Sequence, residues 1–361
     1  MKTRRKLIFW KLIERDYAVR YLMISLFSFV ATIAVVRTFL ALTGYPQLGS
    51  ETLHIAHVLW GGLILYIAAI LPLIYINPRL HYLGAVLSGV GMGLFLDEVG
   101  KFITRQYDYF FPAAAPIMYV FFLLIIVMLI MIRRPEAVDG RAELVKSLEV
   151  VREQLYRPLD IIEREHVEAD LMRVLETDQD SIHQDMARGL LEIVRSDTRS
   201  GPVSEPAWWR KFISQLEDWL TEVRLRWLIG GGMLVLGLMT LKNPAQVLLD
   251  LLTPDSALLN FFTAHAGRQI APVNAPGLYG TRLILEVGVG LLLFIAIILL
   301  AIGKKRTAIN LGYLALLISL TVLDMLLFYF EQFSTVVIVL VQFAVLFSIV
   351  YYRQRYLKIK D

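Results

Sequence analysis

The chain has 361 residues, no cysteine, 57% hydrophobic residues and 19% charged residues, with a mean hydropathy of +0.60. Soluble proteins are about half apolar and about a quarter charged, so this composition excludes an ordinary soluble domain and a disordered chain. Without cysteine, disulfides and thiolate metal sites are excluded as well.

The charges are unevenly distributed along the chain. The segment from Arg133 to Arg226 contains 15 Lys and Arg against 20 Asp and Glu, a net charge of −5, and the rest of the chain carries +9. A basic excess on a hydrophobic body indicates the flanks of membrane spans. We therefore expect the lipid bilayer, and no nucleic acid, as a partner.

A helix needs about 20 mostly apolar residues to cross a bilayer. Eight stretches meet this requirement, four on each side of the polar segment: residues 21–43, 53–76, 80–104, 113–132, 223–241, 282–302, 308–330 and 335–352. The fifth stretch is short and contains three consecutive glycines. Its helix either crosses the whole bilayer or is interrupted at the glycines. The predicted fold is an all-α polytopic membrane helix bundle of about eight spans.

Lysine and arginine in short loops predict the orientation. The N-terminal tail, the turns between spans 2 and 3 and between spans 6 and 7, and the C-terminal tail are basic. Residues 44–52 and 331–334 contain no lysine or arginine. The chain is therefore predicted to be a multi-pass protein of the plasma (inner) membrane, with both termini and the polar segment in the cytoplasm.

Spans 2–4 and 6–8 share a layout. Asp97 follows Gly84 by 13 residues, and Asp324 follows Gly312 by 12, each after a basic turn. This spacing predicts two four-span halves, residues 1–132 and 223–361, separated by a helical cytoplasmic domain, residues 133–222. The alternative is that two unrelated hydrophobic hairpins align equally well.

The cytoplasmic segment has helical periodicity. Apolar residues spaced by three and four from Leu144 to Ile162, extended to Val174, predict one amphipathic helix, and residues 182–193 predict a second. Tryptophans within residues 208–220 are typical of a helix at the membrane interface. These patterns favour a packing or dimerisation module, and hence a homo-oligomer; a sensor domain is the alternative.

Ionisable residues inside spans cost about 2.5–3.5 kcal/mol each on insertion scales, so they need a partner, water or a function. The candidates for a polar cavity are Arg37, His57, Asp97, Glu98, Lys101, Glu286 and Asp324. We expect Arg37, His57 and Asp97 at one depth toward the outer leaflet, and Glu286, Asp324 and Arg282 at matching depths in the second half. Close helix approach in the third span is predicted from Gly89 and Gly93, four residues apart.

Carboxylates and imidazoles beside a cation suit small-solute or ion transport through an outward-facing cavity, with Asp97 and Glu98 as coupling carboxylates. As an alternative, His54, His57, Asp97 and Glu98 hold a divalent metal, and the protein is an intramembrane enzyme acting on a lipid-linked substrate. A third possibility is a scaffold or sensor acting through the cytoplasmic helices. No cofactor besides that metal is predicted.

Two short sequence motifs resemble those of known proteins. Residues 56–62 (AHVLWGG) and 93–102 (GLFLDEVGKF), with the Asp108-Tyr109-Phe110 that follows, resemble a group of bacterial integral membrane proteins of unknown activity. The resemblance covers spans 2–4, about a quarter of the chain. It implies a bacterial inner-membrane protein and brings no substrate with it.

Overall fold

The computed structural model describes residues 13–15, 17–44, 57–104, 111–132, 140–197, 199, 215, 219–252 and 275–357. These residues form helices and contain no strand. Seven helical stretches among them are long and apolar enough to cross a bilayer: Ala18–Leu40, His57–Ile74, Pro78–Asp97, Ala114–Ile132, Glu222–Leu249, Gly277–Ala301 and Lys305–Tyr356. The predictions of an all-α fold and of several membrane spans are confirmed.

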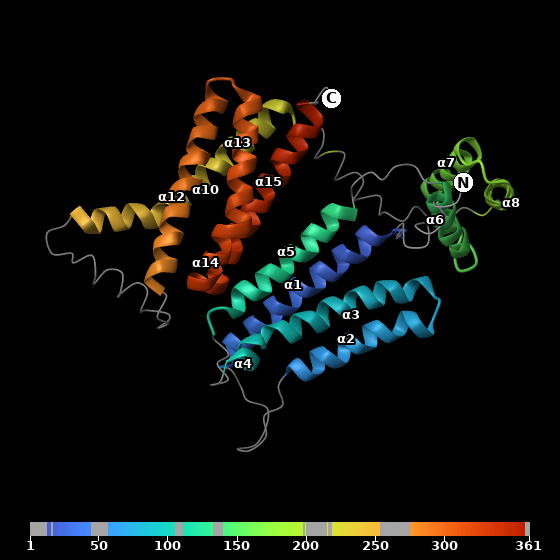
Figure 1. The fold of residues 1–361 in the computed structure, drawn as a ribbon, viewed down its shortest axis with the longest axis horizontal. Coiled ribbons are helices and arrows are strands. Elements are labelled where there is room, and N and C mark those ends of the chain that lie inside the picture. Colours follow the sequence, from blue (N-terminus) through green and yellow to red (C-terminus); the bar gives the residue numbers. More distant parts are fainter. Residues whose placement is uncertain are drawn as a thin grey trace, which may run out of the picture. The chain divides into compact units, whose positions relative to one another are not determined.

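The chain divides into two compact units, residues 1–95 with 124–211 and residues 96–123 with 212–361. The first contains α1 (Ala18–Thr43), α2 (His57–Ile74), most of α3 (Pro78–Asp97), the second half of α5 (Ala114–Ile132), α6 (Gly140–Glu153), α7 (Ile161–Thr177) and α8 (Ser181–Ser196). The second contains α4 (Val99–Ile103), the first half of α5, α10 (Glu222–Leu252), α12 (Ala275–Ala301), α13 (Lys305–Ile318), α14 (Asp324–Glu331) and α15 (Val336–Tyr356) (Figure 1). The predicted three-part division at residues 132 and 222 stays a prediction.

In the first unit, glycines bring the backbone of α3 against those of α1 and α2. A Cβ atom at Gly89 or Gly93 would collide with α1. On α2, a Cβ atom at Gly61 would lie 2.8 Å from the Gly91 carbonyl oxygen and 2.7 Å from the Phe95 nitrogen of α3. Membrane helices approach this closely only through small residues, so the packing role predicted for Gly89 and Gly93 is confirmed.

Two helices differ from their predicted bounds. The predicted span 80–104 is interrupted, because α3 ends at Asp97 and α4 begins at Val99, with Glu98 between them at φ −96° and ψ 7°. By contrast, α10 runs to Leu252 as one continuous helix that includes Pro244. The fifth span is therefore longer than predicted, and its glycines do not interrupt it.

The stretch Lys305–Tyr356 consists of two antiparallel legs. After α14, Gln332 has φ 49° and ψ −130°, which reverses the chain before α15. The amide of Gln342 on α15 then bonds to Asp324 on α14, and Gly312 of α13 faces Ile349 of α15. The two legs correspond to the predicted spans 308–330 and 335–352.

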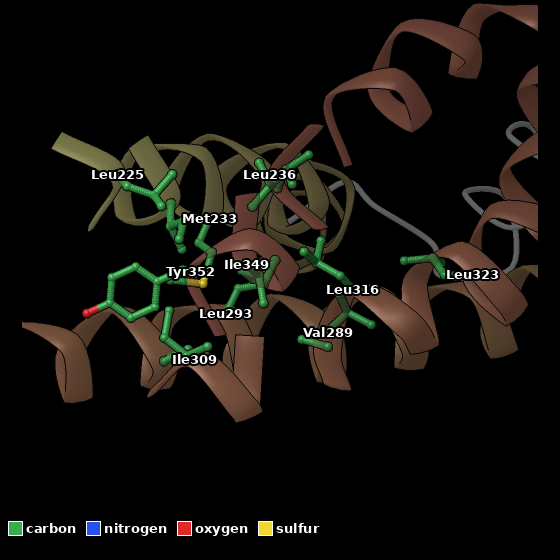
Figure 2. Close-up of a cluster of buried hydrophobic side chains, with 14 of the residues drawn as sticks. Leu225, Met233, Leu236, Val289, Leu293, Ile309, Leu316, Leu323, Ile349 and Tyr352 are labelled. Atoms are coloured by element: carbon green, nitrogen blue, oxygen red, sulfur yellow. The ribbon is translucent and has the colours of Figure 1, made fainter. Parts of the chain in front are cut away.

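A hydrophobic core joins the long helices of the second unit. Figure 2 shows apolar side chains of α10, α12, α13 and α15 interdigitating; the fully buried ones include Leu225, Ile229, Met233, Leu293, Ile309, Leu316, Ile349 and Tyr352. This apolar packing holds in place the helices that carry the buried polar groups described below.

Helices α6, α7 and α8 pack around one apolar core, and these three helices are called the helical domain below. The single amphipathic helix predicted from Leu144 to Val174 is wrong, because α6 ends at Glu153 and α7 begins at Ile161. Pro158 has no N–H to donate within a helix. Asp160 then starts α7 with a reciprocal capping box to Glu163. The second predicted helix is confirmed as α8, whereas residues 208–218 lie almost entirely outside the described residues.

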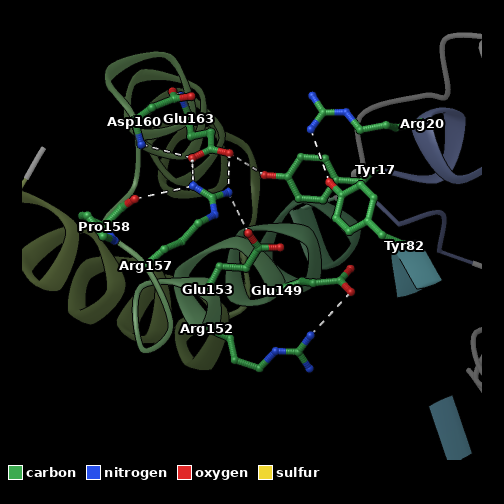
Figure 3. A network of polar contacts seen from close by, with 10 residues as sticks. All are labelled: Tyr17, Arg20, Tyr82, Glu149, Arg152, Glu153, Arg157, Pro158, Asp160 and Glu163. Carbon is green, nitrogen blue, oxygen red and sulfur yellow. Dashed lines mark hydrogen bonds and ion pairs between the residues drawn. The ribbon is translucent and has the colours of Figure 1, made fainter. Parts of the chain in front are cut away.

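A charged network connects this domain to the start of α1 (Figure 3). Arg157 donates to Glu153 at 2.7 Å and to both carboxylate oxygens of Glu163, and the Tyr17 hydroxyl donates to Glu163 at 2.9 Å. Burial alone would favour the neutral acid, but hydrogen bonds from Arg157, the Asp160 N–H and Tyr17 outweigh it and lower the pKa of Glu163. The ionised form of Glu163 therefore stabilises the folded domain.

We predict that the domain loosens in acid. Because folding lowers the pKa of Glu163, its contribution is complete above the ordinary glutamate value of about 4.3 and disappears as the pH falls through the folded value. Glu163→Gln should remove about 1.5–3 kcal/mol at pH 7, the usual contribution of hydrogen bonds to a charged group. Amide hydrogen exchange in α7 of the full-length protein measures both effects. Glu165→Gln, an exposed change on the same helix, is the control, and equal exchange in the two variants would contradict the prediction.

We also predict opposite effects at two adjacent glycines of α2. Gly61→Ala should destabilise the protein by about 1–3 kcal/mol, the usual cost of overpacking, because the new methyl group meets backbone atoms of α3. Gly62→Ala meets open space and should stabilise by up to about 1 kcal/mol through helix propensity. Unfolding in detergent measures the difference. Equal stabilities for the two variants would refute this packing.

Candidate functional site

Besides Asp97 and Glu98 at the junction of α3 and α4, the described part of the second unit has two groups of buried polar side chains, and the first is centred on Arg282 of α12. Its Nε atom donates to Glu286 Oε1 at 2.8 Å, and its guanidinium also donates to Glu331 at the end of α14. Asn243 of α10 donates to the same Glu286 oxygen at 3.3 Å. The guanidinium lies 5.6 Å from the centre of the Phe330 ring, within the range of a cation–π contact. This group thus connects three helices.

The charges of this group do not balance. One guanidinium faces two carboxylates, and Arg282 and Glu286 are buried whereas the Glu331 side chain is 36% exposed. In the described part of the chain, Glu286 Oε2 is buried without a hydrogen-bond partner. One carboxylate oxygen of this group is thus left for a further partner, and Glu331 is the member of the group that is partly exposed.

The second group surrounds Asp324, the first residue of α14, whose side chain is fully buried. Gln342 of α15 donates its amide Nε2 to Asp324 Oδ1 at 3.1 Å. The Tyr119 hydroxyl, from the first half of α5, lies 3.4 Å from Asp324 Oδ2. Among the residues that the structure describes, no lysine, arginine or histidine forms an ion pair with Asp324.

The phenol of Tyr119 has a nearer acceptor than this carboxylate. Its hydroxyl lies 2.6 Å from the Leu320 carbonyl oxygen, and a phenol has one hydrogen to donate. Leu320 belongs to the π-helical turn η2 (Ser319–Leu323), which directly precedes Asp324; such turns are frequent at functional sites. Gln342 Oε1 is buried without a partner in the described structure, so oxygen atoms of several kinds gather at Asp324.

The two groups share one helix. Glu331 follows Asp324 by seven residues on α14, which places both on the same face about 10 Å apart along the axis. Glu286 shares Arg282 with Glu331, so it lies about two helical turns from Asp324. Glu286 and Asp324 therefore belong to different groups.

The predicted site residues of the first half lie in both units. Asp97 and Glu98 are buried at the junction of α3 and α4, and Lys101 donates to Glu98 Oε1 at 2.5 Å. These three belong to the second unit, whereas Arg37 on α1 and His57 at the start of α2 belong to the first. Their convergence on one cavity stays a prediction.

The proposed metal ligands are only partly described. His54 lies outside the described residues. Within the described part of the chain, no group of three or more histidine, aspartate or glutamate side chains is placed to hold a metal ion. A metal bound by His54, His57, Asp97 and Glu98 therefore stays a prediction.

Four residues of these groups were not predicted from the sequence: Tyr119, Asn243, Glu331 and Gln342. Gln342 had a usable signal, because it is the one amide side chain within the apolar run 336–347. Asn243 fell outside the predicted fifth span, whose actual helix continues to Leu252. Tyr119 and Glu331 gave no local signal, since an aromatic residue in a span and an acidic residue in a turn are both ordinary.

Comparisons with known proteins found no match: no protein family, no curated protein and no solved structure matches the chain. The resemblance of residues 56–62 and 93–102 to a bacterial group therefore has no support from these comparisons. The helices define the chain as a multi-pass integral membrane protein, and any function has to be argued from its geometry.

We predict that Arg282→Gln is among the most destabilising substitutions in the second unit. It leaves two carboxylates without their shared cation, and removing one partner of a buried ion pair typically costs about 3–5 kcal/mol. The double variant Arg282→Gln with Glu286→Gln should recover part of this loss. Unfolding in detergent, with the exposed Arg306→Gln as control, measures it. If Arg282→Gln is as stable as the control, the group does not connect the helices.

Proposed function

We propose that this protein transports a monovalent cation, alone or coupled to a small solute, across the bacterial inner membrane, and that Asp324 binds this cation. One observation carries the proposal. Asp324 is fully buried in a predicted membrane-spanning leg, and its hydrogen-bond partners among the described residues are a phenol and an amide rather than a cationic side chain.

A buried carboxylate needs a positive partner. An isolated ionised carboxylate is very costly in a medium of low dielectric constant, and ionisable residues within membrane spans usually mark ion or substrate pathways. Glu98 and Glu286 have cationic partners in Lys101 and Arg282. Asp324 therefore obtains its neutralising charge from a proton or a metal ion that arrives from solution. Its oxygen-rich surroundings suit either cation.

The proposed topology gives the site a direction. The two legs of Lys305–Tyr356 raise the seven candidate stretches to eight crossings, and the basic loops favour a topology with both termini and the helical domain in the cytoplasm. The hairpin turn with Glu331 then faces outward. Glu331 and Glu286 are the first carboxylates that an incoming cation meets, and Asp324 lies about 10 Å further in.

The π-helical turn offers a means of movement. It contains one residue more than an α-helical turn, and converting it to α-helix would rotate α14 by about 100°. Such a rotation would carry Asp324 away from Tyr119 and Gln342. We propose that binding and release of the cation are coupled to this rearrangement.

The test measures cation flux into vesicles that contain the purified protein. In one arm a pH-sensitive dye inside the vesicles reports proton flux, and in the other labelled sodium ions are counted. Asp324→Asn keeps the hydrogen-bonding shape but cannot carry the charge, so we expect flux of the transported cation to fall by at least about tenfold, equivalent to about 1.4 kcal/mol.

Asp185→Asn, at an exposed carboxylate of α8, is the matched control and should leave flux unchanged. Flux through Asp324→Asn at the wild-type rate would exclude Asp324 as the binding group. If wild-type vesicles pass neither cation faster than empty vesicles, even with a mixture of small solutes added outside, the transport proposal fails. The scaffold or sensor function would then be favoured, with the contact between Tyr17 and Glu163 as its structural basis.

A further inference from the structure

We infer that α1, α2 and α3 form a binding site for an anionic phospholipid at their cytoplasmic ends. A groove of about 360 Å³ lies between these three helices. Its walls and floor include Leu22 of α1, Ala68 and Pro72 of α2, and Gly84 and Ala85 of α3. This site is independent of the transport proposal, because every residue of it belongs to the first unit.

The groove has the shape and lining for an acyl chain. The glycine contacts described above hold α3 tightly against both neighbours. Nearer the cytoplasmic end, the small residues Gly84 and Ala85 of α3 line the groove opposite Ala68 and Pro72 of α2. Its surface is mostly apolar and lies within membrane-spanning segments. Lipid tails, rather than water, are the surroundings of such a surface.

The mouth of the groove carries positive charge. Arg15 lines it and donates to His81 Nε2 at 2.6 Å, which holds the guanidinium at this end of α3. Arg15 also pairs with Glu149 at 3.5 Å, and Arg152 pairs with the same Glu149 oxygen at 3.8 Å (Figure 3 shows Glu149 and Arg152). Two cations share one carboxylate, so one positive charge remains. The Arg15 side chain is 49% exposed and can reach a phosphate.

The positive charge at Arg15 and the apolar lining of the groove together favour an anionic phospholipid as the ligand. The cytoplasmic leaflet is the one rich in anionic lipids, and basic pockets between helices on that side bind their headgroups. A soluble anion would use the arginine but not the apolar groove, whereas a neutral lipid would use the groove but not the charge. An anionic phospholipid uses both, with its phosphate at Arg15 and one tail along Gly84 and Ala68.

Lipid retention by the full-length protein in detergent tests this site. The protein is titrated with phosphatidylglycerol or phosphatidylcholine, and bound lipid is counted by native mass spectrometry. We expect phosphatidylglycerol to bind more tightly, and Arg15→Gln to weaken its binding about fivefold, the value of one basic residue near an anionic surface. Arg79→Gln is the matched control, because Arg79 is exposed at the same end of α3 but does not line this groove.

A second variant tests the groove itself. A Cβ atom at Gly84 meets nothing nearer than the Ala68 carbonyl oxygen, at 3.7 Å, so the β-carbon of Gly84→Leu is accommodated, and the rest of the side chain is expected to occupy groove volume. It should weaken binding of both lipids at least fivefold. Equal binding of the two lipids by the wild type, or unchanged phosphatidylglycerol binding by Arg15→Gln, would overturn the proposal. The Arg15→Gln result decides the matter even if Gly84→Leu does not fold.

Discussion

A polar group inside a bilayer has to find its partner within the protein, and this constraint shapes the second unit. Arg282 connects α12 to α14 because two carboxylates require its charge, and Asn243 adds α10 to the same group. At the junction of α3 and α4, Glu98 is neutralised by Lys101, three residues away. Asp324 departs from this pattern, since its described neighbours provide hydrogen-bonding groups but no positive charge. This setting is the basis of the proposal that Asp324 binds a cation.

The first unit is governed by a different constraint. Lipid tails are as apolar as leucine, so membrane helices gain little from the hydrophobic effect when they associate and depend on close packing instead. Glycines on two faces of α3 provide that packing, and they fix α3 between α1 and α2. Small residues also line the groove beside Gly84, where we propose that lipid binds. Within this unit, the Tyr17 hydroxyl at the start of α1 donates to Glu163 of α7, and this bond connects the apolar helix α1 to α6, α7 and α8.

The positions of the spans and of α8 depend on neighbouring residues in the chain, and the sequence predicted them. Apolar runs located every described span, and the spacing of residues 182–193 located α8. Errors arose where a local feature overrode the apolar period. The stripe continuing past Leu155 concealed the break at Pro158, and the apolar run 80–104 concealed the interruption at Glu98. At both positions the apolar residues continue although the helix is interrupted. An apolar residue indicates that a position is buried, but it does not show that the helix continues through that position.

The sequence by itself determined that this is a multi-pass membrane protein, since the length and apolarity of its segments are local properties. It also identified the charged residues within the predicted spans, which need a partner or a function because they are costly in a bilayer. Only the tertiary structure decided which of them are neutralised. Arg282 and Glu331 are 49 residues apart, and Tyr119 and Asp324 are 205 apart, so no local pattern relates them. Pairing across helices depends on how the legs turn and rotate against each other, and those rotations are set by the packing of whole faces.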